Sequence, residues 1–285
     1  MPRLIKPRTV RCKVCGGNAR FMTRLPQRRP VDIARCSVCG LTFVVEDYTD
    51  QELEKAYGAQ DVAAYYAEIS RATGEKATSS ARDLKRLGVH SILDVGCGFG
   101  HMLEAARDVG IEAEGFEISG QCADRCSDLG FTVHVGELEK VERQYEAVTL
   151  LDVAEHVPNP LRTFRVCREL AQTIYIHTPR VSAWDHLFLA LVRLAPTRSL
   201  AHRWLKSRLS VAHLQLWSDR SLRVALSRSG WRVIDQRAET ELSWPVEKYV
   251  DTYGRFLPRR LALLIARAIR PTLKNKAVVV AVSLT

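Results

Sequence analysis

The stretch Ser91–Gly100 constrains the fold more than any other part of the chain. An apolar run that includes Ile92, Leu93 and Val95 has the length of a buried strand, and three alternating glycines follow it. From Met102 onwards, apolar residues recur with helical spacing. A strand, a glycine turn and a helix N-terminus in this order predict the start of a βαβ unit. Such a turn lets backbone approach a ligand closely, and the helix N-terminus offers unpaired N–H groups.

Two carboxylates narrow the class of ligand, because the glycine turn alone is also found in dinucleotide sites. Asp94 lies just before the glycines, where a carboxylate suits an ammonium group better than a pyrophosphate. Glu117 ends the next apolar segment, residues 111–116, where it can take both hydroxyls of a ribose. The motif LDVGCGFG with Glu117 resembles class I S-adenosylmethionine-dependent methyltransferases. The resemblance spans roughly residues 91–235.

This resemblance implies an α/β fold with a Rossmann-like, seven-stranded, doubly wound sheet, and S-adenosylmethionine as cofactor. It also implies a set of cofactor contacts. Glu137 ends the third predicted strand, at the position where an acidic residue, more often Asp, receives the adenine amino group. The full predicted set is Asp94, Gly96, Cys97, Gly98, Phe99, Glu117, Ile118, Glu137, Leu138, Asp152 and Val153.

The segment after the fourth predicted strand, residues 152–160, reads DVAEHVPNP. It resembles the EHVxDP-like segment of many small-molecule methyltransferases. Because open α/β sheets bind ligands at the carboxyl ends of their strands, Glu155 and His156 are expected to face the ligand crevice. In ubiquinone-type O-methyltransferases the matching segment can hold a divalent metal, which implies Asp152, Glu155 and His156 here.

Methyl transfer from a sulfonium needs an aligned nucleophile, exclusion of water and removal of one proton. Only a His, Glu or Asp near the crevice can take that proton near neutral pH. His156 is the first candidate for this general base, His213 the second and His177 the third. The alternative for His156 is a hydrogen bond that only holds its loop.

Two CxxC pairs near the N-terminus predict a zinc ribbon over residues 1–47. Four thiolates satisfy a tetrahedral zinc ion, and each CxxC places two of them on one turn. A domain of this size has too little core to fold alone, so the metal would supply much of its stability. Four unmetallated thiols are the alternative. The predicted ligands are Cys12, Cys15, Cys36 and Cys39.

The rest of the chain divides into three predicted segments. Residues 48–88 are expected to form a helical cap over the cofactor, broken into two helices at 74–78. Residues 89–285 form the methyltransferase domain, with a lid insertion at 181–216. Residues 255–271 predict a basic amphipathic helix, which has Leu257, Leu261 and Leu264 on one face and Arg260 and Arg267 on the other. Core packing is the first interpretation of its apolar face, and contact with a membrane surface or a partner is the second.

Charge is concentrated at the two ends of the chain. Residues 1–30 hold nine Lys or Arg and residues 255–285 hold seven, with no Asp or Glu in either segment. The net charge of +10 therefore leaves the middle of the chain net acidic. Basic ends can meet nucleic acid, an anionic lipid surface or a nucleotide-linked substrate, or can remain solvated. No apolar run approaches the ~20 residues of a membrane span, and no signal peptide is indicated, so a cytoplasmic location is expected.

Three functional hypotheses follow. The first is methyl transfer to an oxygen or carbon atom of a small sugar, natural-product or lipid-linked acceptor. The second is RNA methylation, which the ribbon and basic ends favour. No Asn-Pro-Pro-Tyr-type motif follows the fourth predicted strand, however, and no RNA-binding module appears beyond the ribbon. The third is a non-enzymatic protein whose ribbon recruits a partner; the intact Asp94, Gly96, Gly98 and Glu117 oppose it.

Overall fold

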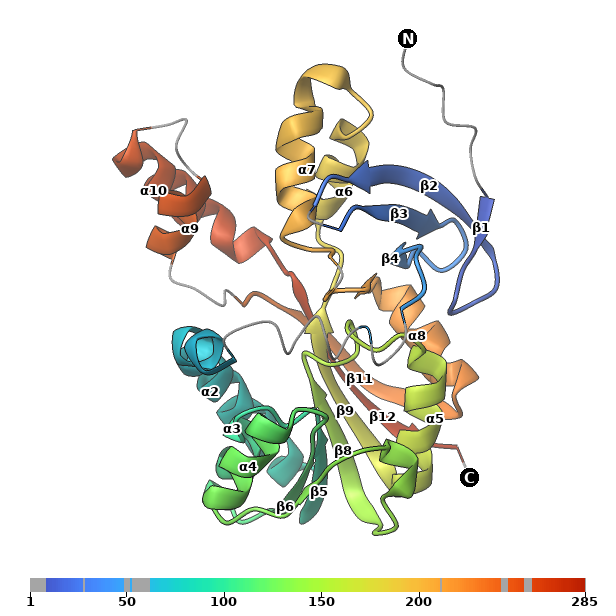
Figure 1. Cartoon of the computed structure of the whole chain (residues 1–285), viewed down its shortest axis with the longest axis vertical. Helices are drawn as coiled ribbons and strands as arrows, with labels where there is room; N and C mark the ends of the chain where they lie inside the picture. The colour runs from blue at the N-terminus through green and yellow to red at the C-terminus, as the bar shows by residue number, and fades with distance from the viewer. Residues whose placement is uncertain are drawn as a thin grey trace.

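The computed structural model describes residues 9–27, 29–48, 52, 62–210, 212–241, 246–253 and 258–284. A seven-stranded sheet in the order β11–β12–β9–β8–β5–β6–β7 forms its body (Figure 1). The strands are β5 (Ser91–Val95), β6 (Glu112–Phe116), β7 (Val133–His134), β8 (Tyr145–Leu151), β9 (Ala171–Pro179), β11 (Trp231–Glu239) and β12 (Lys276–Ser283). All neighbours from β7 to β9 are parallel, whereas β12 runs antiparallel to both β9 and β11. The predicted seven-stranded, doubly wound sheet is confirmed.

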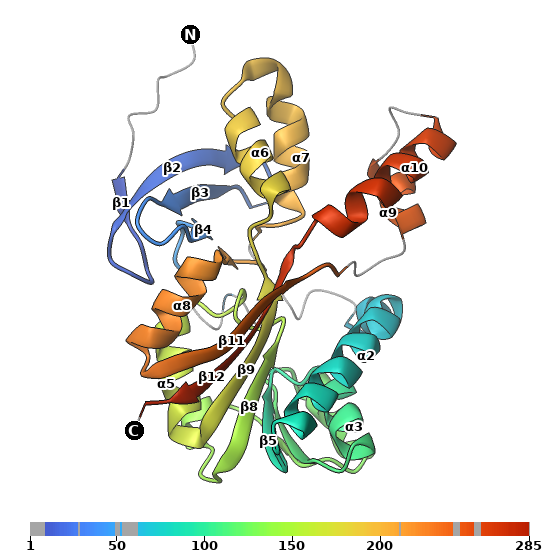
Figure 2. The same ribbon diagram turned by 180° about the vertical axis from the view of Figure 1, so that it is seen from behind.

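Helices cover both faces of this sheet (Figures 1 and 2). One face carries α2 (Val62–Arg86), α3 (His101–Asp108) and α4 (Gly120–Asp128). The other face carries α5 (Pro160–Leu170) and α8 (Asp219–Arg228). A buried apolar cluster fills each interface, so the sheet is closed on both sides and only the edge at its strand ends is left for a ligand.

The predicted break at residues 74–78 is wrong, because α2 is one continuous helix of 25 residues. Ala77, Ala81 and Leu84 lie on one side of it and are fully buried in the cluster they share with α3 and the sheet. This packing outweighs the helix penalty of Gly74, which is only about 1 kcal/mol relative to alanine.

A second, five-stranded sheet contains the ribbon, in the order β1–β2–β3–β4–β10. Its strands are β1 (Thr9–Arg11), β2 (Asn18–Leu25), β3 (Val31–Cys36), β4 (Thr42–Val44) and β10 (Gln215–Leu216). The first four belong to the N-terminal segment, but β10 comes from the part of the chain just before α8. There Gln215 and Leu216 pair antiparallel with Phe43 and Thr42.

The structure places the insertion 181–216, predicted as a lid, against this ribbon sheet (Figure 1). Its helices, α6 (Ala183–Leu191) and α7 (Arg198–Lys206), form a hairpin with a short 3-10 turn between them, Ala195–Thr197. Leu189 and Leu205 are buried together with Leu25 and Ile33 of the ribbon. The ribbon and the insertion therefore share one apolar core.

A second helical hairpin, α9 (Val246–Tyr253) and α10 (Arg259–Ile269), lies between β11 and β12 and projects beyond the end of the sheet (Figures 1 and 2). The predicted basic helix 255–271 corresponds to α10 and the 3-10 turn Arg270–Thr272, while its Leu257 lies outside the described residues. None of the helices in the described part of the chain combines the length and apolar character needed to cross a membrane.

Candidate functional site

The glycine turn after β5 meets the ends of two neighbouring strands. Gly96 and Gly98 have φ angles of 72° and 53°, the left-handed region that favours glycine. A Cβ on Gly96 would lie 2.7 Å from Cγ2 of Val153, in the segment after β8. The backbone N–H of Gly98 donates to Oε2 of Glu117 at 2.9 Å, and that of Ser119 donates to Oε1 at the same distance. The turn, Glu117 and Val153 thus surround one point at the carboxyl edge of the sheet.

Asp94 lies under this turn, within β5, with 3% of its surface exposed. Thr149 of β8 donates its hydroxyl hydrogen to Oδ1 of Asp94 at 2.5 Å. Burial raises the pKa of the Asp94 carboxyl to about 7, although the Thr149 hydrogen bond opposes the rise. A neighbouring cation would favour its ionised form, so this carboxyl is suited to an ammonium group.

Other predicted cofactor residues line the same turn from below and beside it. Cys97 is buried, and a Cβ on Gly115 would lie 2.6 Å from its Sγ, so β6 passes directly under the loop. The Phe99 ring faces the Arg125 guanidinium at 4.9 Å. Ile118 is half exposed next to Glu117, where an apolar side chain can cover a base.

Glu137 and Leu138 stand further out, after β7. Leu138 is buried in a 3-10 turn, Leu138–Lys140, whereas Glu137 is exposed and pairs with Lys140 at 3.3 Å. The structure therefore leaves the Glu137 carboxylate at the surface, apart from the buried Asp94 and Glu117.

The carboxylate of Asp152, a predicted cofactor contact, is held by two lysines. The φ angle of Asp152 is +56°, and its carboxylate binds Lys76 of α2 and Lys276 of β12. Glu241 lies within 3.8 Å of both lysines and 3.3 Å from Nε2 of His177. Burial alone would raise the pKa of Asp152, but Lys276 and Lys76 outweigh it and hold that pKa well below its usual value. The two lysines had no sequence signal, because they lie far from Asp152 along the chain.

His156 lies on the loop between β8 and α5. Its Nδ1 is 2.7 Å from the Ala212 carbonyl oxygen, so in the neutral ring Nδ1–H donates and Nε2 is the nitrogen that can accept a proton. Nε2 is 3.7 Å from Oε1 of Glu155. The His213 ring meets the His156 ring edge to face, with centroids 4.7 Å apart. The two histidines predicted as alternative bases are therefore neighbours.

Burial shifts the pKa values of Glu155 and His213 in opposite directions. Burial raises the pKa of Glu155, whose Oε2 also accepts a hydrogen bond from Thr178 at 2.9 Å. Burial lowers the pKa of His213 to about 3, with His156 adding to the shift. His213 is thus a neutral imidazole at pH 7 and a weak proton acceptor, which favours His156 as the base.

A divalent metal has a different ligand set here from the predicted one. Glu155, His156 and His213 place one ligand atom each within 4.8 Å of one another. Asp152, the third predicted ligand, is engaged by the two lysines. A carboxylate and two imidazoles suit a divalent transition metal, so these residues fit one.

The loop of His156 is held by β10, which the sequence analysis did not identify. Leu214 and Gln215 both donate backbone N–H groups to the Glu155 carbonyl, at 2.8 and 3.1 Å. The Gln215 side-chain amide donates to the carbonyls of Ala154 and Val157, at 3.1 and 2.8 Å. Since β10 pairs with β4, the ribbon is connected to the candidate base through one short strand.

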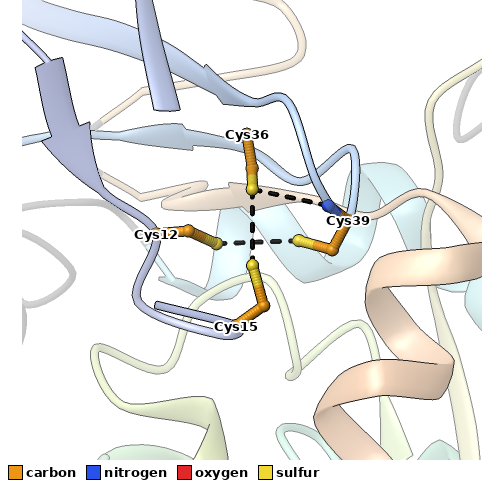
Figure 3. Close-up of side chains that lie close together, drawn as sticks. All are labelled: Cys12, Cys15, Cys36 and Cys39. Atoms are coloured by element: carbon orange, nitrogen blue, oxygen red, sulfur yellow. Dashed lines mark hydrogen bonds between the residues drawn. The ribbon is translucent and has the colours of Figure 1, made fainter. Parts of the chain in front are cut away.

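The four ribbon cysteines converge on one point (Figure 3). Their sulfurs lie within 4.8 Å of one another, with Cys12–Cys39 at 3.6 Å and Cys15–Cys36 at 3.4 Å. A tetrahedral ion with Zn–S bonds of 2.3 Å needs sulfurs about 3.8 Å apart. Backbone N–H groups also approach the sulfurs, as for Gly17 to Cys15 at 3.4 Å. This donor set fits zinc.

Comparison with known proteins identifies the family of this chain. A family model described as a methyltransferase domain matches residues 55–236. Ubiquinone biosynthesis O-methyltransferase of Methylococcus capsulatus is 30% identical over 113 residues, covering 35% of this chain and 47% of that protein. The same enzyme of Paraburkholderia xenovorans is 32% identical over 114 residues, covering 35% and 49%. The match thus spans about half the length of these curated relatives.

Solved structures share the fold at low sequence identity. Magnesium protoporphyrin IX methyltransferase from Synechocystis with bound SAH has a TM-score of 0.51 at 15% identity, over 81% of this chain and 92% of that one. A chain from the Haloferax volcanii complex of the Trm112 methyltransferase activator and a putative methyltransferase has a TM-score of 0.54 at 15% identity, over 78% and 96%. The chain belongs to the methyltransferase domain family and has the Rossmann-like fold of class I methyltransferases.

Proposed function

We propose that this protein transfers a methyl group from S-adenosylmethionine to a hydroxyl oxygen of a small-molecule acceptor. The observation that carries the proposal is the arrangement of Asp94 and Glu117 on two sides of a left-handed glycine turn. The names of the curated relatives favour an oxygen acceptor over carbon.

At the cofactor end, Glu117 and Asp94 contact different groups of the cofactor. Glu117 holds the turn through the Gly98 N–H and is placed to accept hydrogen bonds from ribose hydroxyls. Asp94, with its raised pKa, becomes ionised when an ammonium group is brought against it. Glycine at 96 leaves room for close backbone approach, because Val153 closes the other side. The bound cofactor supplies an activated methyl group.

At the acceptor end, His156 removes the proton of the acceptor hydroxyl. Nε2 of His156 takes the proton of the acceptor hydroxyl as the new O–C bond forms and the S–C bond to the methyl group breaks, which leaves S-adenosylhomocysteine. The Nδ1–H bond to Ala212 keeps the ring oriented. A divalent metal held by Glu155, His156 and His213 would occupy this same Nε2, so its Lewis-acid assistance to the hydroxyl would replace His156 as the base and not accompany it. A zinc ion on the four ribbon cysteines would be structural, since no open ligand position remains.

The test is a binding and acceptor screen with the full chain. S-adenosylhomocysteine binding is measured by calorimetry, and labelled methyl transfer is measured to a panel of phenolic, sugar and lipid hydroxyls and to bulk RNA. Asp94→Ala should abolish cofactor binding while the fold persists by circular dichroism. Asp108→Ala, at the exposed end of α3, is the matched control. Unchanged affinity in Asp94→Ala, or label in RNA alone, would contradict the proposal.

A further inference from the structure

Helix α10 is apolar on two sides, and only one of them is covered. Ala262, Leu263 and Ala266 pack against Val246 and Val250 of α9. The other side exposes three large apolar residues, Leu261 at 46%, Leu264 at 66% and Ile265 at 40%. The expectation that this face packs in the core is therefore wrong for these three residues. Neighbouring large apolar residues that stay exposed on a surface helix indicate a contact with a partner or a membrane.

Charge identifies the chemistry of that neighbour. Helix α10 contains no acidic residue. The expectation that Arg260 lies on the face opposite the leucines is wrong, because Arg260 is four positions before Leu264 and therefore on the same side of the helix. Arg259 and Arg267 are paired with Asp251 and Glu247 of α9. In the described part of the chain, Arg260, which borders the exposed leucines, forms no ion pair. An apolar stripe edged by arginine suits an anionic, partly apolar surface.

The α9–α10 hairpin lies at the same end of the sheet as the candidate site. The α9–α10 hairpin projects beyond the end of the sheet where Lys276 meets Asp152, which is also the edge of the candidate site (Figure 2). The base of the hairpin is anchored, because Nε1 of Trp184 in α6 donates to Thr272, just after α10, at 3.2 Å. The hairpin that carries the exposed residues thus projects from the same end of the sheet as the candidate site (Figure 2).

We propose that α10 docks this protein on an anionic lipid surface. Leu261, Leu264 and Ile265 enter the boundary between headgroups and acyl chains, and Arg260 contacts the headgroups. The helix lies in the plane of the interface, because its 11 residues are too few to span a bilayer. The docking is separate from methyl transfer and does not require that the proposed reaction be correct.

Co-sedimentation of the full chain with vesicles tests the docking. Vesicles of phosphatidylglycerol and phosphatidylcholine should bind at least about tenfold more protein than phosphatidylcholine alone, with binding that falls as salt rises. The double variant Leu264→Glu/Ile265→Glu should lose at least about tenfold of that binding. Arg260→Gln should lose a few-fold and flatten the salt dependence. Leu87→Glu should bind as the unsubstituted protein does, because Leu87 is similarly exposed but precedes the amino end of β5, opposite the strand ends that form the candidate site.

Three outcomes would overturn the proposal. The first is equal binding to neutral and anionic vesicles, and the second is undiminished binding by the double variant. The third is a dimer in analytical ultracentrifugation that the double variant abolishes, because a second copy would then cover the face. Circular dichroism and S-adenosylhomocysteine affinity, both expected to be unchanged, show that the double variant is folded and keep this test apart from that of the reaction.

Discussion

The cofactor end and the acceptor end of the candidate site are built in different ways. At the cofactor end, Asp94, Gly98 and Glu117 come from one uninterrupted βαβ unit. At the acceptor end, His156 is held by Ala212, and Glu155 by β10, which in turn pairs with the ribbon strand β4. One end therefore depends on local chain order, and the other on three segments that are distant in sequence.

Because of this difference, we expect that a change at the acceptor end can abolish methyl transfer while cofactor binding persists. The cofactor end makes no hydrogen bond with the ribbon among the described residues, and its contact with the ribbon is the apolar cluster that Phe43 shares with Leu93 and Val95. The acceptor end contacts the ribbon through β10. Unfolding of the ribbon should therefore displace the loop of His156, while the cofactor still binds. The predictions below challenge that separation, from the largest expected effect to the smallest.

Loss of zinc should abolish methyl transfer and spare cofactor binding. Structural zinc sites supply about 10–16 kcal/mol of apparent binding free energy in zinc-finger peptides, so the ribbon of Cys36→Ser should unfold and leave β10 without its partner. Elemental analysis should find one zinc per chain, absent from the variant, and S-adenosylhomocysteine affinity should stay within about threefold. Cys167→Ala, a buried thiol on α5, should keep its zinc. A stable, active, metal-free protein would contradict the ribbon assignment.

Removal of the base should affect the acceptor end alone. His156→Ala should lower kcat by about 10²–10⁴-fold, because a positioned base contributes about that much, with cofactor affinity unchanged. His156→Asn keeps a hydrogen-bonding side chain but cannot take a proton near neutral pH. If asparagine restores the rate, His156 only holds the loop and His213 becomes the residue to test. Equal loss in both variants, with loss of the acidic limb of the pH profile, supports the base.

The pH dependence of cofactor binding should reveal Asp94. Its pKa is raised to about 7, so below pH 7 the free protein carries a neutral carboxyl where the cofactor ammonium needs an ionised one. Affinity for S-adenosylhomocysteine should fall about tenfold per pH unit below that value, measured by calorimetry. Asp94→Asn should bind weakly with a flat profile. A steep profile in Asp94→Asn would assign the titration elsewhere.

The raised pKa of Asp94 also affects folding. As pH rises from about 4 to 7, the unfolded chain ionises at Asp94 before the folded protein does, so the free energy of unfolding falls over this range. Asp94→Asn should remove this fall.

Removal of the Ser218 side chain should show whether the ribbon is held against the methyltransferase domain at this residue. Ser218 caps α8, accepting from the Ser221 N–H at 3.0 Å, and its hydroxyl donates to the Cys39 carbonyl at 2.7 Å. Ser218→Ala should cost about 1 kcal/mol of unfolding free energy in urea and speed zinc release to a chelator. Ser182→Ala, which removes the cap of α6, should cost a similar amount without affecting zinc release. Equal zinc release in both would show that the ribbon is not held at Ser218.

Much of the fold could be predicted, because its signals are local. The fourth strand, predicted to end before residue 152, is β8, which ends at Leu151 in the structure. The glycine motif predicted the β5–α3 turn. The break in α2 was predicted wrongly, because a single glycine reports a local preference and not the packing of Ala77 and Leu84. The clamp of Asp152 by Lys76 and Lys276 had no signal, since pairing of distant charges leaves no periodic trace in a sequence.

The sequence by itself determined the cofactor turn and the four-cysteine cluster, because both depend on short-range backbone geometry and residue spacing. Only the tertiary structure decided where the insertion 181–216 packs, which residues surround His156, and that Leu264 is left uncovered. These outcomes depend on which apolar faces meet across the chain. Many pairings satisfy the same hydrophobic pattern, and only the complete packing selects one of them.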